Sequence, residues 1–217
     1  MNAAIFPLPN VVFFPDTFLP LHVFEPRYRA MTDEAIAGDR TIVVVLARAE
    51  KPPGEWPAIH PVGTLGRIEV AEPLTDGRWH IALRGLTRVR IGTLQERPAG
   101  WFSGEIEAIG ETLPDLQDPR VAERKANFLL TALRYDERIL EGRHAEDYLT
   151  AALPFPTAVN RAASILRIGV SEKQDLLAMD DLEERSRAVE GLMIDQIEAR
   201  EAVERFAGRK PENPQAN

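Results

Sequence analysis

The 217-residue sequence contains no cysteine, so it can form neither a disulfide nor a thiolate metal site and cannot use a cysteine nucleophile. It also lacks any apolar run that approaches the roughly 18 residues of a membrane-spanning helix. Its start, MNAAIFPLPN, has no basic residue before the apolar part and soon reaches a proline, unlike a secretory signal peptide. These absences predict a cytoplasmic protein with no membrane partner.

Basic residues are fewer than acidic residues in this sequence. The sequence has 26 Lys and Arg residues against 34 Asp and Glu residues, which gives a formal net charge of −8. Binding of nucleic acid depends on a basic face that displaces counterions from the phosphates. We therefore do not expect nucleic acid as a general partner.

Recognisable catalytic motifs are missing as well. The chain has no GxxxxGK[ST] phosphate-binding loop. His22, His60, His80 and His144 are widely separated, and none has a second histidine three or four residues away. The sequence predicts no catalytic residue, no metal and no cofactor, and hence a protein that is not an enzyme.

The most informative stretch runs from Phe6 to Arg29, FPLPNVVFFPDTFLPLHVFEPRYR. Its prolines exclude a helix and a long central strand, because proline has no backbone donor and a fixed φ. Short extended pieces remain, and a helix can begin only after Val23. Glu25 then stands at the N-cap, Pro26 at the first helical position, and Gly38 at the expected end.

Strand patterns follow this helix. The run from Thr41 to Ala47, TIVVVLA, has no alternation and predicts a strand buried on both faces. Alternating segments begin at Val62, and Asp76-Gly77 between two of them predicts a hairpin turn. A change of parity just after Gly85 predicts a β-bulge.

Helical spacing of apolar residues replaces the strand pattern after Glu111 and continues to about Phe206. Side chains that can accept backbone hydrogen bonds mark the expected helix starts. The predicted caps are Thr157, Ser171 with Gln174 as a capping box, and Asp180 or Asp181 for the last helix.

The opening segment, PLPNVVFFPDTFLPLHVFEPRYR, resembles the first motif of the LON substrate-binding domain, which lies at the N-terminus of ATP-dependent Lon proteases and also occurs in short stand-alone bacterial proteins. Its FEPRYR ending is more similar to the stand-alone type. VGTL, DGR and LRGLTRVRI resemble the strand motifs of the family, and SEKQDLLAMDDLEERSRAV resembles its helical portion. The resemblance therefore covers nearly the whole chain.

This resemblance implies an α+β fold, a PUA-like β pseudobarrel with one inserted helix, followed by a C-terminal α-helical bundle. We expect the barrel in residues 1–113, the bundle in 114–206 and a disordered tail in 207–217. The implied function is non-catalytic recognition of unfolded or partly folded polypeptide, with a protease encoded elsewhere as a further candidate partner. No serine and lysine share the glycine-rich surroundings of the Lon peptidase dyad, and Ser171 and Lys173 would point in different directions on a helix.

Large apolar residues around Pro15 are candidates for the polypeptide-binding surface. They cannot all point inward from so kinked a chain, and an exposed subset beside a groove would contact apolar side chains of a client. The alternative is packing between the barrel and the helices, and a tryptophan in the following proline-rich loop has the corresponding choice between binding and clamping that loop. The candidates are Phe13, Phe14, Phe18, Leu19 and Trp56.

Charged residues gather at the predicted corner between strand and helix. His22, Glu25, Arg27 and Arg29 could line a ligand cleft, but an arginine that pairs with the cap carboxylate would hold the corner equally well, and we favour the corner. A metal shared by His22 and Glu25 is less expected than a structural hydrogen bond.

Three arginines, Arg84, Arg88 and Arg90, have the same parity on a predicted strand. They open the alternative of a small-ligand or RNA-binding pseudobarrel. Neighbouring acids and the lack of an aromatic stacking row on that face instead favour a barrel exterior laced with salt bridges.

Overall fold

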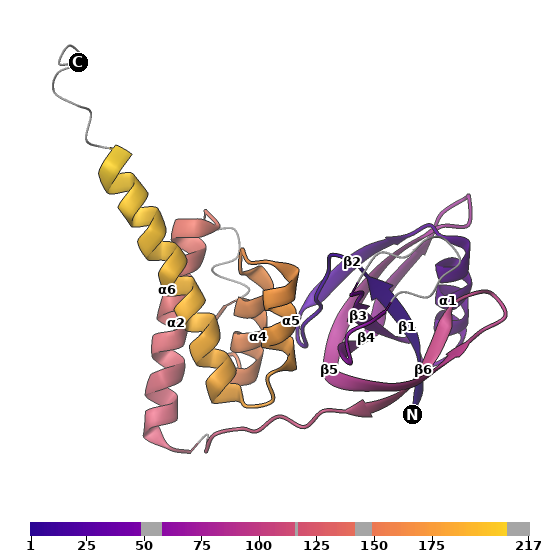
Figure 1. Cartoon of the computed structure of the whole chain (residues 1–217), viewed down its shortest axis with the longest axis horizontal. Helices are drawn as coiled ribbons and strands as arrows, with labels where there is room; N and C mark the ends of the chain where they lie inside the picture. The colour runs from indigo at the N-terminus through magenta and orange to yellow at the C-terminus, as the bar shows by residue number, and fades with distance from the viewer. Residues whose placement is uncertain (49–57, 116, 142–148, 208–217) are drawn as a thin grey trace, which may run out of the picture.

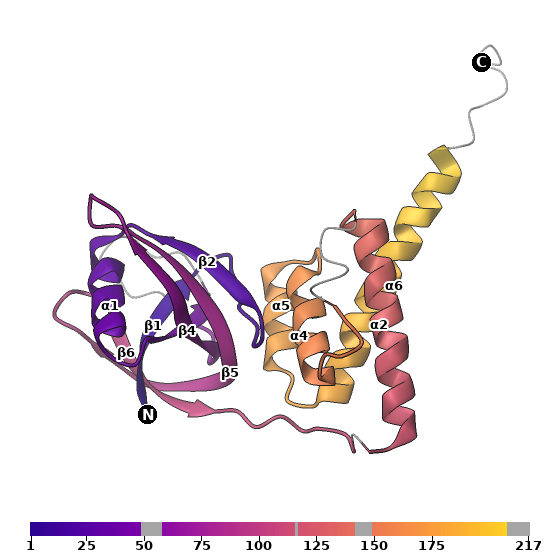
Figure 2. The same cartoon turned by 180° about the vertical axis from the view of Figure 1, so that it is seen from behind.

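The computed structural model describes residues 1–48, 58–115, 117–141 and 149–207. A barrel of strands occupies one end of an elongated molecule and helices occupy the other (Figure 1). Turning the molecule by 180° shows the same division into two parts (Figure 2). The predicted α+β class is confirmed.

Six strands form one sheet whose order is β2-β5-β4-β3-β1-β6. They are β1 (Asn2–Leu8), β2 (Phe18–Val23), β3 (Thr41–Leu46), β4 (Val62–Pro73), β5 (Trp79–Glu96) and β6 (Phe102–Ala108). The pair β1–β3 is parallel and the other pairs are antiparallel. Because β6 pairs with both β1 and β5, the sheet closes into a barrel, and β2 remains outside the ring on the first half of β5.

Helix α1 (Pro26–Ala37) is inserted between β2 and β3, with the predicted start and end. Pro26 occupies the first turn, where a missing N–H costs nothing. At the other end the Gly38 N–H donates to the carbonyls of Glu34 and Ala35. Buried Met31 and Tyr28 pack this helix against the barrel interior.

The apolar run of β3 is buried along its whole length, as predicted. Ile42 and Val44 pack in one hydrophobic cluster of the barrel, and Val43 and Val45 pack in another. Because both faces of the strand are covered by apolar side chains, no polar residue is needed at alternate positions.

The hairpin and the bulge are also where the sequence predicts them. Gly77 has a φ of 79°, the left-handed region that favours glycine. In the β4–β5 pair, Leu65 lies opposite Thr87 and Gly66 opposite Gly85, so Leu86 is the extra residue of a bulge.

The helices of the other part are α2 (Pro119–Ile139), α4 (Phe155–Ile165), α5 (Val170–Ala178) and α6 (Leu182–Ala207). In both views α4 and α5 lie between the barrel and the paired long helices α2 and α6 (Figures 1 and 2). Phe128, Tyr135, Val159 and Met193 are among the buried residues of their common core. None of the helices in the described ranges is both long and apolar enough to cross a membrane.

Two predicted helix caps are wrong and one is confirmed. Thr157 lies inside α4, where its hydroxyl donates to Asp16 Oδ2 at 2.9 Å. Helix α5 starts one residue before Ser171, and its first turn is closed by Glu172, whose carboxylate accepts from the backbone of the preceding glycine. Asp181 does cap α6, since its Oδ1 accepts from the Glu184 N–H at 2.9 Å.

Candidate functional site

Two successive residues of the opening segment pack in two different hydrophobic cores. Phe13 is 3% exposed and packs in the barrel with Ile68 and Leu83, whereas Phe14 is 0% exposed and packs in the helical core. The backbone between them is held by Thr64, whose hydroxyl donates to the Phe13 carbonyl. For these two candidates the packing alternative describes the structure, because the chain bends at this point and buries both rings.

Two further candidates, Phe18 and Leu19, lie beyond Pro15 on β2. Leu19 is half-buried and faces the barrel core, so it too is a packing residue. Phe18 points the other way and is 60% exposed, and Phe24, just past the end of β2, is 61% exposed. Trp56 lies outside the described residues.

Register places the outward-facing residues of three strands beside one another. Phe18, Pro20 and His22 of β2 lie opposite Arg84, Ala82 and His80 of β5. Ala82 and His80 lie in turn opposite Val70 and Glu72 of β4. We call this surface the outer β2 face, and its members are Phe18, Pro20, His22 and Phe24 from β2 and its end, Ala82 and His80 from β5, and Val70 and Glu72 from β4.

Ring contacts make part of this face continuous. The His22 and His80 rings are 4.9 Å apart between centroids and meet edge to face, and the Phe24 ring lies 6.0 Å from the His22 ring. A cluster of three or more possible metal-ligating side chains does not occur in the part of the chain that the structure describes. The geometry therefore offers an apolar and aromatic contact surface.

Only Phe18 and His22 of the eight members of the outer β2 face were site candidates from the sequence, and the missed members include the exposed apolar residues Phe24 and Val70. Phe24 continues the alternation of Phe18, Pro20 and His22 by one step, a signal that the sequence contains. Val70 reaches its place through a register shift between Ile68 and Val70 in the β4–β5 pair, which sequence alternation does not disclose.

The corner charges do not form a cleft. Arg27 pairs back onto the cap carboxylate of Glu25, with Nη2 and Nε at 2.9 Å and 3.0 Å from Oε2, and its guanidinium lies over the Tyr28 ring. Arg29 instead packs under the hairpin turn at Gly77, where a Cβ would clash with its guanidinium. His22 belongs to the outer β2 face, so only Glu25 and Arg27 pair at the corner.

The arginine stripe is interrupted by the helices. Arg84 forms a surface ion pair with Glu69 at 2.8 Å, and Arg90 is exposed. Arg88, between them, is only 3% exposed because α5 and the residues after it cover this part of the barrel exterior. The burial of Arg88 removes one of the three arginines on which the RNA-binding alternative depends, and the surface ion pair of Arg84 agrees with the favoured barrel exterior laced with salt bridges.

Arg88 joins the barrel to the end of α5. Its Nη1 donates to the carbonyls of Leu177 and Met179 at 3.1 Å and 2.7 Å and to Asp180 Oδ1 at 3.0 Å. A cation at the C-terminal end of a helix is favourable for the exposed carbonyls there. Buried Arg185 also donates to the Met179 carbonyl, which makes this the polar centre of the barrel–helix interface.

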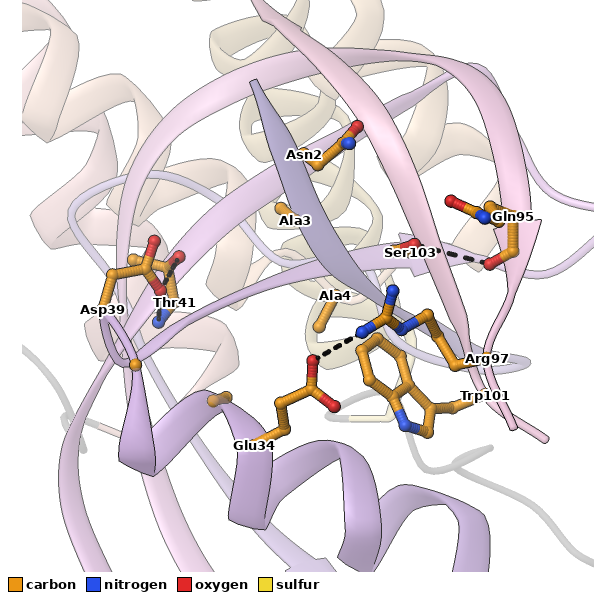
Figure 3. A pocket seen from close by; sticks show the side chains of 12 residues that line it. Asn2, Ala3, Ala4, Glu34, Asp39, Thr41, Gln95, Arg97, Trp101 and Ser103 are labelled. Carbon is orange, nitrogen blue, oxygen red and sulfur yellow. Dashed lines mark hydrogen bonds and ion pairs between the residues drawn. The ribbon is translucent and has the colours of Figure 1, made fainter. Parts of the chain in front are cut away.

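An open cavity of about 470 Å³ lies between the C-terminal half of α1, the start of β3 and strands β1, β5 and β6. Figure 3 shows Arg97 in its wall, with Nη2 at 3.0 Å from Glu34 Oε1 and the guanidinium over the Trp101 ring. On the far side, Asp39 Oδ1 accepts from the hydroxyl and the N–H of Thr41. The lining thus combines paired polar groups with small side chains, which suits a small polar molecule.

Comparison with protein families gives one match over most of the chain. Residues 2–195 match the model of the ATP-dependent protease La (LON) substrate-binding domain. Lon protease 2 of Syntrophobacter fumaroxidans is 30% identical over 209 residues, which cover 94% of this chain and 26% of that protein. The Lon protease of Xanthomonas oryzae pv. oryzae is 28% identical over 217 residues, 96% of this chain and 25% of that protein. The chain spans about a quarter of these relatives.

Solved structures share the fold. The N-terminal domain of a Mycobacterium avium complex Lon protease superposes with a TM-score of 0.71 at 17% identity, covering 90% of this chain and 99% of that one. A Lon N-terminal domain protein from Xanthomonas campestris gives a TM-score of 0.62 at 23% identity, covering 87% and 96%. At these identities the likeness concerns the fold alone.

Proposed function

The chain belongs to the LON substrate-binding domain family, and from this premise we propose that it recognises unfolded or partly folded polypeptide without catalysing a reaction on it. The relatives are named Lon proteases, and the matched region is the one described as substrate-binding. We further propose that the protein works in the cytoplasm, with a protease encoded elsewhere as a partner.

The outer β2 face is the observation that carries the proposal. Phe18, Phe24 and Val70 are three of the eight large apolar residues that are exposed in the described part of the chain. Isolated exposed apolar residues are ordinary, but several on one surface indicate a contact site. Burial of one such side chain contributes roughly 1.5–3 kcal/mol, so two or three anchors suffice for weak, sequence-tolerant binding.

Binding of fluorescein-labelled casein, measured by fluorescence anisotropy, tests the proposal. We expect Phe18→Ala and Phe24→Ala each to weaken binding about tenfold, which corresponds to about 1.4 kcal/mol. Leu130→Ala is the matched control, because Leu130 is 65% exposed but lies on α2. Equal affinity of all variants, or an equal loss in the control, would contradict the proposal.

The absence of catalysis has its own test. Casein incubated with purified protein without ATP should stay intact on a denaturing gel for as long as in a buffer control. Casein cleavage whose rate follows the protein's own concentration profile through size-exclusion chromatography would contradict this part of the proposal.

Binding of a small ligand is the second candidate function, and the cavity beside Arg97 favours it, since its volume is within the usual range for ligand sites. A panel of small carboxylates and amines at millimolar concentration should then raise the melting temperature. Arg97→Gln should abolish the increase. RNA binding has less support, because Arg88 is buried.

A further inference from the structure

We infer that a bound polypeptide segment lies across the outer β2 face and is held by its side chains, and that it does not add a strand to the free edge of β2. The inference rests on the proposed function and specifies which groups of the protein bind the client polypeptide. It follows from the backbone geometry of β2 and from the pattern of side chains on three strands.

The edge of β2 is accessible in principle. Among the strands that the structure describes, β2 pairs with β5 alone, so one row of its backbone groups points away from the sheet. Exposed edges of this kind are templates for strand addition. Whether they can be used depends on which N–H groups they offer.

The hydrogen bonds at the start of β2 fix these groups. Gly85 N–H donates to the Thr17 carbonyl at 3.0 Å, and the Asp16 N–H donates to the Gly85 carbonyl at 3.0 Å. Bonding alternates along an antiparallel pair, so the backbone groups of Leu19 and Leu21 also face β5. Those of the intervening residues, Phe18, Pro20 and His22, face outward.

Pro20 is the middle residue of that outward row, and it has no N–H. An added strand would therefore lack a donor at the centre of the six-residue edge. Natural sheets place proline at edges for this reason, since it prevents pairing with other chains. The free edge of β2 is therefore poorly suited to pairing with an added strand.

The outer β2 face, beside that edge, is suited to contact apolar side chains of the client. The middle row of this face, formed by Pro20, Ala82 and Val70, is apolar. The whole face measures about 10 Å across the three strands and about 20 Å along them. This area accommodates roughly six extended residues.

Charge differs between the ends of the face. The cross-strand row of Phe18 continues with Arg84 and Arg67. The carboxylates at this end are already engaged, Glu69 with Arg84 and Asp16 with the Thr157 hydroxyl, whereas the His80 end carries Glu72. The complementary occupant is an extended apolar segment of another polypeptide with an acidic residue at one end and a basic residue at the other.

Two peptides of sequence DFALAFK separate face binding from edge binding. One has a normal backbone, and the other has alternate amides N-methylated, which removes the donors that strand addition needs while keeping every side chain. Binding is measured by competition with labelled casein. We expect the two affinities to agree within about threefold.

A tenfold or greater loss on methylation would overturn the inference in favour of strand addition and leave the proposed function standing. Failure of both peptides to compete, with casein still bound, would also overturn it. Failure of casein itself to bind would instead reject the proposed function. These three results are distinguishable.

Protein variants provide the second arm. Val70→Asp places a charge in the apolar row at an exposed position, and it should weaken both peptides about tenfold. Leu130→Asp makes the same change at an exposed position of α2 and should leave both affinities unchanged. Unaltered binding to the Val70→Asp protein would overturn the inference.

Discussion

Phe13 and Phe14 are neighbours in the chain, and their rings lie in different hydrophobic cores. The turn that follows them is closed by Thr17, whose hydroxyl donates to the Phe14 carbonyl at 2.7 Å. The next residues continue directly into β2. One short segment thus connects the barrel, the helices and the outer β2 face.

Phe14→Ala should strongly destabilise the protein. The ring is fully buried in the helical core, and truncation of such a phenylalanine costs about 3–5 kcal/mol. Urea unfolding monitored by circular dichroism measures the loss. Phe18→Ala removes an exposed ring four residues later and should change the free energy of unfolding by about 0.5 kcal/mol or less, and a similar loss in both variants would contradict the burial assignment.

Arg88→Ala should destabilise the contact between the barrel and the helices. The substitution leaves the carbonyls of Leu177 and Met179 without their donor and Asp180 without its partner. Asp180 is half exposed and is rehydrated by solvent, so the main cost is that of the carbonyls left without a donor, typically about 1–3 kcal/mol. Denaturant unfolding gives the free energy, and hydrogen exchange should show increased exchange in α5.

The control for this change is Arg187→Ala, which breaks an exposed pair with Glu183 at 3.3 Å on α6. Exposed pairs contribute about 0–1 kcal/mol, so the control should be nearly neutral. If Arg88→Ala costs no more than the control, the interface does not depend on Arg88.

Local signals in the sequence were sufficient for several elements. The boundaries of α1 follow from Pro26 and Gly38, and the bulge follows from the parity change after Gly85, because each depends on residues close in sequence. Asp181 capped its helix for the same reason. Nearby hydrogen bonds and steric limits decide these features.

Features that depend on distant partners were not predictable in this way. Arg88 has the parity of an exposed residue, and its burial comes from a helix 89 residues further on. Ser171 and Gln174 have capping-box spacing, yet Gln174 donates to the Val62 carbonyl at 3.0 Å, which only the docked barrel supplies. Tertiary contacts therefore overrode local preference at the barrel–helix interface and divided the opening segment between two cores.

His60 should make stability depend on pH. Burial and the positive charge of Arg48 lower the pKa of His60, and Asp175 partly opposes them. The unfolded chain therefore binds a proton more readily than the folded chain, so the contribution of His60 is present above its unfolded pKa of about 6.5 and is lost as the pH falls below it. Urea unfolding at several pH values between about 7.5 and 5.5 should show less pH dependence in His60→Asn than in wild type.

Asp175→Asn provides the opposing control for His60. Without this carboxylate the folded pKa of His60 falls further, so the loss of stability on acidification should increase. The assignment fails if His60→Asn has the wild-type pH dependence, or if Asp175→Asn reduces it.

Pro20→Val should open the edge of β2 to association between copies of the chain. The change supplies an outward N–H at the centre of the edge and a β-branched side chain that favours extended backbone. Sedimentation velocity should show a greater rise of average mass with concentration than in wild type. Pro98→Val is the matched control, because Pro98 is exposed in the turn between β5 and β6, away from the edge of β2. Wild-type behaviour of the Pro20 variant, or equal association of the Pro98 variant, would show that the missing donor does not protect this edge.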